Sequence, residues 1–135
     1  MIDLILAALL LQAAPEVCNA AGQPETPRAG CPRWRLTQQE EDVTDYTDPA
    51  SVNATGDGFL IDQRTVFAED RPSGLRSIIT TMRVDCVRRT LIADHVKGYD
   101  SAGGLLSDGP IPNARLHPIE PNSSAARMVA EFCPR

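Results

Sequence analysis

Histidine is scarce in this chain, with two residues among 135, and neither lies near a cysteine in the sequence. Zinc sites usually bring their ligands in close pairs, such as C-x-x-C or H-x-x-x-H. The four cysteines are instead separated by 13, 55 and 47 residues. This spacing argues against zinc and favours structural disulfides, and we expect neither a metal nor a cofactor. The cysteines are Cys18, Cys31, Cys86 and Cys133.

The chain also lacks the G-x-S-x-G turn that exposes the serine nucleophile of many hydrolases. Its two histidines are His95, which lies beside Asp94 and near Asp100, and His117. A nucleophilic cysteine needs a positioned base, and His95 could approach Cys86 across neighbouring strands. A disulfide explains Cys86 better. We therefore expect no catalytic residue, and a small secreted hydrolase is kept only as an alternative.

A basic surplus is absent, with 13 Lys and Arg against 18 Asp and Glu and a net charge of −5. This balance argues against nucleic acid, which requires a clustered basic face. Five arginines near predicted strands could meet an anionic partner, but solvated strand faces balanced by acids explain them more simply. They are Arg33, Arg35, Arg83, Arg88 and Arg89.

An acidic run could supply oxygen ligands to calcium, but the D-x-D-x-D-G register is absent. A solvated loop or edge-strand face is the simpler interpretation, because charges there discourage edge-to-edge pairing of a sheet. The acids are Glu40, Glu41, Asp42, Asp45 and Asp48.

Long apolar runs are missing too, and the nearest is LILAALLLQAA at residues 4–14. It is too short to span a bilayer but has the length of a signal-peptide core, with a cut after Ala13 or Ala14. The preceding Met1–Asp3 carries no Lys or Arg, which leaves a buried first strand or a misplaced start as alternatives. Four cysteines in a short chain suit an oxidising compartment. We expect residues 1–14 to be a signal peptide, with no transmembrane segment after its removal, and the protein to be periplasmic, at the outer-membrane surface or secreted.

Residues 15–33 form a polar run interrupted by four prolines, which sustains neither a helix nor a central strand. We expect an extended N-terminal arm here. Cys18 and Cys31 would close it into a loop that stabilises by about 3 kcal/mol, although four cysteines allow three connectivities. Cys18 follows Pro15–Val17, which is not the small-residue run of a lipid-anchor cysteine.

The stretch Ser77–Cys86 alternates, with mostly apolar side chains at its even positions, and this pattern predicts a half-buried strand with Cys86 on the core side. Ser77 falls in the polar row. Apolar residues recur at helical spacing from Ala125 to Cys133, which places Cys133 on a buried stripe as well. A C-terminal helix over residues 122–133, joined to the strand by Cys86–Cys133, is the predicted scaffold. Asn122 or Ser123 would be its N-cap.

Further strands are predicted on both sides of the central one, separated by Asn-, Asp- and Gly-rich turns. Pro110, Pro112 and Pro118 keep the stretch before the helix irregular or at a sheet edge. Gly98 indicates a bulge. The order of strands followed by one helix predicts an α+β fold, an antiparallel sheet of about five or six strands with one C-terminal helix. The additional strands are Trp34–Thr37, Val43–Thr47 (stopped by Asp48-Pro49), Phe59–Phe67 after the turn Asn53–Gly58, Thr90–Tyr99 and a short one at Leu105–Leu106.

A series of motifs is spread over residues 34–133. They comprise Trp34, DYTDPAS from Asp45, TVF from Thr65 with Arg71-Pro72 behind it, Ser77 leading to Asp85-Cys86, Tyr99 before a glycine turn, and Pro121-Asn122-Ser123 opening a helix that ends in Cys133. In their order and spacing these motifs resemble the surface-adhesin E family of bacterial envelopes. The resemblance implies a disulfide-linked sheet and helix in an exported, non-enzymatic domain, 34–135. It also implies adhesion to host matrix proteins such as vitronectin and laminin.

We interpret the chain as an exported envelope protein that binds a macromolecular, protein partner through a face or edge of its sheet. Strand addition is the easiest mode for an open antiparallel sheet, and a homodimer through a sheet edge is a related expectation. A periplasmic inhibitor or chaperone of an envelope enzyme is the alternative among binding proteins.

Overall fold

The computed structural model describes residues 34–134. The predicted signal peptide at 1–14, the arm at 15–33 and the Cys18–Cys31 loop lie outside the described residues. The described part forms seven strands and one helix. The elements are β1 (Arg35–Gln39), β2 (Val43–Ala54), β3 (Gly58–Phe67), β4 (Ser77–Asp85), β5 (Thr90–Tyr99), β6 (Leu105–Pro110), β7 (His117–Pro118) and α2 (Ser124–Phe132).

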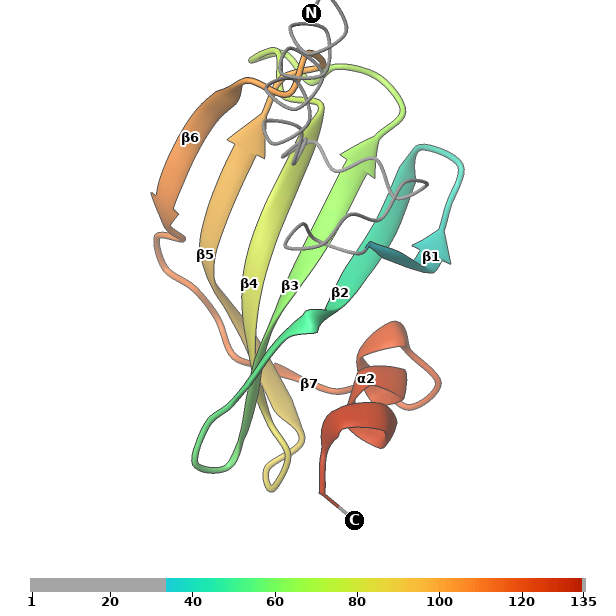
Figure 1. Cartoon of the computed structure of the whole chain (residues 1–135), viewed down its shortest axis with the longest axis vertical. Helices are drawn as coiled ribbons and strands as arrows, with labels where there is room; N and C mark the ends of the chain where they lie inside the picture. The colour runs from blue at the N-terminus through green and yellow to red at the C-terminus, as the bar shows by residue number, and fades with distance from the viewer. Residues whose placement is uncertain (1–33, 135) are drawn as a thin grey trace, which may run out of the picture.

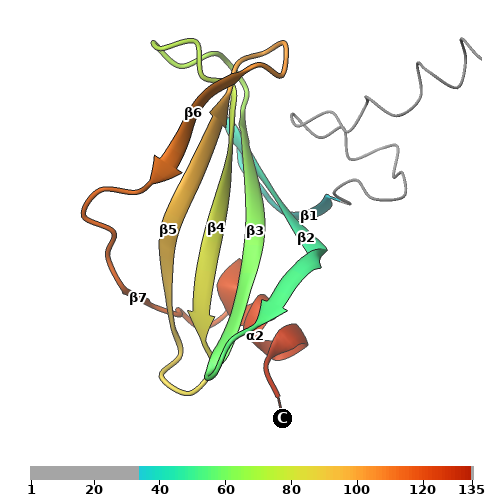
Figure 2. The same cartoon turned by 60° about the vertical axis from the view of Figure 1, so that its left-hand side comes forward.

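The sheet is antiparallel throughout and its spatial order is the chain order, β1-β2-β3-β4-β5-β6, with the two-residue β7 also pairing with β5. Figures 1 and 2 show a strongly twisted sheet with α2 beside the end where the β2–β3 and β4–β5 turns lie. The predicted fold class is confirmed. Because each strand pairs with its sequence neighbour, β1 and β6 are the outermost strands.

The core lies between α2 and the turn-bearing end of β3 and β4. Phe59 opposes Val84 and Ile61 opposes Met82 across the β3–β4 pair, so four apolar side chains share one face. Met128 and Val129 are the buried residues of α2. Ile119, from the segment before the helix, completes the buried set, which comprises Phe59, Ile61, Met82, Val84, Ile119, Met128 and Val129.

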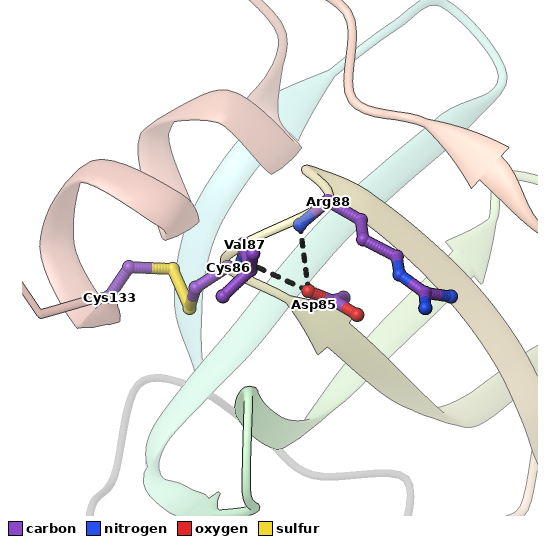
Figure 3. Close-up of a disulfide and its surroundings, with 5 residues drawn as sticks. All are labelled: Asp85, Cys86, Val87, Arg88 and Cys133. Carbon is purple, nitrogen blue, oxygen red and sulfur yellow. Dashed lines mark hydrogen bonds between the residues drawn. A yellow bond between two sulfur atoms is a disulfide. The ribbon is translucent and has the colours of Figure 1, made fainter.

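Both ends of α2 are fixed. Ser123 is the N-cap, as predicted, and its hydroxyl accepts the Ala126 N–H at 3.1 Å and donates to the Glu120 carbonyl at 2.6 Å. Cys133 is the C-cap and is bonded to Cys86, with 5.8 Å between the Cα atoms (Figure 3). The predicted strand–helix disulfide is confirmed, although β4 itself ends at Asp85 and Cys86 begins the turn.

The prediction that Asp48-Pro49 stops the second strand is wrong. β2 continues to Ala54 and contains a bulge instead of ending there. The bulge is residues 49–52, which lie between the pairs Asp48–Asp62 and Asn53–Leu60. Side chains replace the missing ladder bonds there. The Asp48 carboxylate accepts the Ala50 N–H at 3.0 Å, and the Ser51 hydroxyl donates to the Asp48 carbonyl at 2.7 Å and accepts the Asp62 N–H at 2.9 Å. Proline, which has no N–H, is tolerated at such a bulge.

Other boundaries also shift. The first strand begins after Trp34 and runs to Gln39, and the predicted Asn53–Gly58 turn is reduced to residues 55–57. The last predicted strand extends to Pro110, which lies at a sheet edge as expected. Ser77 is buried rather than solvated, opposite the buried Tyr99 across the β4–β5 pair.

The β5–β6 register shifts beside Gly98, but the additional residue there is Leu106 of β6, since Gly98 pairs with Ser107 and Tyr99 with Leu105. The additional residue of β5 itself is Asp94, between the pairs Thr81–His95 and Met82–Ala93. A Cβ atom at Gly98 would lie 2.7 Å from both Leu75 Cδ1 and Ser107 Oγ. A side chain at Gly98 would therefore have to displace the ends of these two side chains, which come from β6 and from the loop before β4.

Candidate functional site

The two outer strands expose very different edges. At β1, the Arg127 guanidinium of α2 donates to the Thr37 carbonyl at 3.1 Å, and Arg35 pairs with Glu131 through two bonds of 2.6 and 3.0 Å. The hydrogen bond to the Glu131 carboxylate raises the pKa of Arg35. A register shift at Leu36 further interrupts the strand. The helix thus engages the β1 edge, which is how natural sheets protect an outer strand.

The β6 edge carries no such cover among residues 34–134. Five of the six residues of β6 are exposed. The Ile111 N–H donates to the Asp94 carbonyl of β5 at 3.0 Å. Since backbone groups alternate in direction along a strand, Asp108 directs its N–H and C=O away from β5, and Pro110 directs its carbonyl the same way. These groups form a short open edge available to another strand.

Two exposed leucines lie at the start of this strand. Leu105 and Leu106 are 56% and 48% exposed, and Leu116, from the segment after β6, is 60% exposed. Leu106 is the additional residue at the β6 register shift, since Leu105 pairs with Tyr99 and Ser107 with Gly98. Among residues 34–134, two of the five exposed large hydrophobic residues thus lie on β6, and Leu116 lies next to β7. We call β6 with Leu105 and Leu106 the open edge.

His95 lies on β5, the strand that pairs with β6. Its Nε2 is 2.6 Å from Asp108 Oδ1, and both side chains are more than one-third exposed. This contact joins β5 to β6. Asp94 is 3.6 Å from Arg83, and Asp100 accepts the N–H groups of residues 102 and 104 in its own turn.

The remaining candidate residues are dispersed. His117 lies in β7, and Arg88 and Arg89 lie in the β4–β5 turn, far in sequence from Arg35. Arg35 is paired with Glu131 and Arg83 lies near Asp94, as expected for strand faces balanced by acids. Arg33, Cys18 and Cys31 lie outside the described residues. In the acidic run, Asp45 accepts the Thr65 hydroxyl at 2.7 Å, and Asp48 supports the β2 bulge. Within residues 34–134, no three His, Cys, Asp or Glu side chains are grouped to hold a metal ion.

Sequence reasoning identified Leu105–Leu106 as a strand start but did not predict their exposure. The signal was present, because adjacent residues of a strand point to opposite faces and two adjacent leucines cannot both face one core. That the two leucines lie on an outer strand not covered by a helix could be learned only from the order of the strands in the sheet.

Residues 34–134, most of the chain, match the family model for surface-adhesin protein E. The chain belongs to the surface-adhesin protein E family. No match is found among curated proteins. Membership in the surface-adhesin protein E family indicates a surface adhesin, a class that acts by binding and not by catalysis, and together with the disulfide it indicates an exported protein. In the described part of this family member, no helix is both long and apolar enough to cross a membrane.

Proposed function

We propose that the protein is an exported, non-enzymatic adhesin of the bacterial envelope that binds a protein partner by strand addition at β6. In this proposal, residues 1–14 direct export and are removed, residues 15–33 form an extended arm, and residues 34–135 form the binding domain. Extracellular-matrix proteins are the partner class that the family relationship favours.

The contrast between the two outer strands carries the proposal. The β1 edge is engaged by Arg127 and by the Arg35–Glu131 pair, whereas the open edge combines outward backbone groups with exposed leucines. Strand addition uses these two features, since backbone hydrogen bonds supply affinity and side-chain contacts supply specificity. The register shift and Pro110 confine the available edge to a few residues, so a short partner segment is expected.

The test uses a charge placed at matched positions on the two edges. Leu105 and Leu36 are 56% and 55% exposed, on β6 and β1 respectively. Leu105→Lys should weaken binding to immobilised vitronectin or laminin by about tenfold, because a lysine at an edge opposes strand addition. Leu36→Lys should bind as the unmodified protein does.

Equal binding by both variants, or loss in Leu36→Lys alone, would contradict the proposal. Size-exclusion chromatography over a range of protein concentrations tests whether the expected homodimer forms. A second copy at β6 would give a dimer that Leu105→Lys dissociates, and matrix binding would then compete with dimer formation.

A further inference from the structure

The open edge offers few backbone groups to a partner strand. Backbone groups along β6 face β5 and solvent in turn. The Ile111 N–H donates to β5, so Asp108 directs both its N–H and its C=O outward, and Pro110 directs out a carbonyl but has no N–H. Leu106, the additional residue at the register shift, ends this regular row. A partner strand therefore finds one donor and two acceptors.

The side chain of Asp108 lies beside these backbone groups. It opposes Lys97 across the β5–β6 pair, and its Oδ1 lies 2.6 Å from His95 Nε2. Both of these residues are on β5, behind the edge, and the Asp108 side chain remains 44% exposed. Leu105, opposite Tyr99, lies on the same face of the sheet. A residue opposite Asp108 on an added strand would meet its carboxylate directly, with Cβ atoms about 5 Å apart.

These groups oppose antiparallel pairing of β6 with a second copy of itself. When Asp108 lies opposite Asp108, its donor and acceptor are both used, but two like charges face each other, which destabilises the pair. When Asp108 lies opposite Pro110, the Asp108 carbonyl faces a residue without an N–H and stays unpaired. A shift in the other direction brings the second copy onto Leu106, where the row is irregular. Charge and proline at an edge oppose edge-to-edge pairing in natural sheets for these reasons.

We propose that β6 excludes a second copy and takes an extended segment of a different protein, in an antiparallel register centred on Asp108. This proposal rests on the strand addition proposed for β6 and defines the segment that fits there. The residue opposite Asp108 has an N–H and a side chain without negative charge. The residue opposite Pro110, two positions before it, also has an N–H. The residue two positions after it is apolar and lies against Leu105.

Capped pentapeptides test this register on the full exported chain. Val-Thr-Gln-Thr-Val, with its glutamine opposite Asp108, should shift the Asp108 amide saturably in ¹H–¹⁵N correlation spectra and slow its exchange with solvent. Val-Thr-Glu-Thr-Val should bind about threefold more weakly, because its carboxylate lies opposite that of Asp108. N-methylation of the glutamine should weaken binding about tenfold, because the Asp108 carbonyl loses its donor. N-methylation of the second residue, whose N–H points away from β6, is the matched control and should leave the affinity unchanged.

Two double variants test the exclusion of a second copy. Asp108→Ser/Pro110→Thr removes the charge and supplies the missing N–H, so it should sediment as a dimer at a concentration at which the unmodified protein sediments as a monomer. The control Asp57→Ser/Pro72→Thr makes the same changes at exposed residues of two other loops and should stay monomeric. All four positions are exposed, so both variants should fold, and thermal unfolding checks this. Asp108→Ser alone should bind the glutamine and glutamate peptides equally.

A dimer of the unmodified protein that Leu105→Lys dissociates would overturn the exclusion of a second copy and would leave strand addition at β6 in place. Equal binding of the glutamine and glutamate peptides, or equal effects of the two N-methylations, would overturn the register. An Asp108 amide that no peptide shifts would overturn it as well. The proposed function fails on a different result, namely unchanged matrix binding by Leu105→Lys.

Discussion

Ser51 replaces a backbone partner inside the sheet. Its hydroxyl donates to the Asp48 carbonyl and accepts the Asp62 N–H at a point where β2 bulges away from β3. A part-buried N–H without a partner costs about 1–3 kcal/mol, so the Ser51 hydroxyl contributes substantially to the stability of this bulge. At this scale the sequence was misleading, because Asp48-Pro49 has the composition of a strand end.

We expect Ser51→Ala to lower the free energy of unfolding by about 1–2 kcal/mol, because it leaves the Asp62 N–H unpaired. Urea unfolding followed by circular dichroism measures the change. Ser73→Ala, at an exposed serine of the β3–β4 loop, is the matched control and should lose less than about 0.5 kcal/mol. Similar losses in the two variants would show that the Ser51 hydrogen bonds do not support the bulge.

The helix α2 has nine residues, which is too few for a stable isolated helix in water. It depends on three supports: the Ser123 cap, the buried Met128 and Val129, and the disulfide at Cys133. The sequence predicted all three, because helical spacing, a serine before the first turn and a cysteine on the buried stripe are local signals. Which sheet edge the helix would protect was not predictable, since the Arg127–Thr37 contact joins residues 90 apart.

Two adjacent serines test the cap. Ser123→Ala should lower the free energy of unfolding by about 1 kcal/mol, since the Ala126 N–H loses its acceptor. Ser124→Ala changes the next residue, whose hydroxyl caps nothing in the described structure, and should leave stability equal or slightly higher. Chemical denaturation of the two variants measures their free energies of unfolding. Equal values would show that the Ser123 hydroxyl does not stabilise the start of the helix.

The disulfide should be the largest of the three supports. It joins residues 47 apart, and closure of such a loop stabilises by about 4 kcal/mol on the chain-entropy estimate. Cys86→Ser and Cys133→Ser should each lose about this amount, and the double variant should lose no more, because both remove the same bond. Additive losses in the double variant would show that the two side chains act separately.

For the whole molecule, the fold class followed from the order of strands and helix, while the open edge followed only from the topology. The strand order, β1 to β6 in sequence, leaves the last strand at an edge, and α2 returns to the opposite side of the sheet (Figure 1). No local pattern in residues 105–110 distinguishes an edge strand covered by a helix from one left uncovered, apart from Pro110.

Export concerns the whole molecule, because it determines where the mature chain begins and whether its cysteines are oxidised. We expect the mature protein, purified from the envelope and culture-medium fractions, to begin near Ala14 or Pro15 when its N-terminus is read by mass spectrometry. Peptide mapping without reductant should also recover Cys86 joined to Cys133. An intact Met1 in the exported fraction would contradict the signal-peptide prediction without affecting the disulfide.

The Cys86–Cys133 bond determines how the chain would respond to a pull at β6. The bond closes a covalent ring of β5, β6, β7 and α2, so in the strand addition proposed above a partner at β6 would pull on a ring and not on a free tail. Force applied at β6 would reach β4, in the middle of the sheet, along two arms of backbone at once. The segment between the two cysteines, which are 47 residues apart, therefore could not be extended end to end while the disulfide is intact.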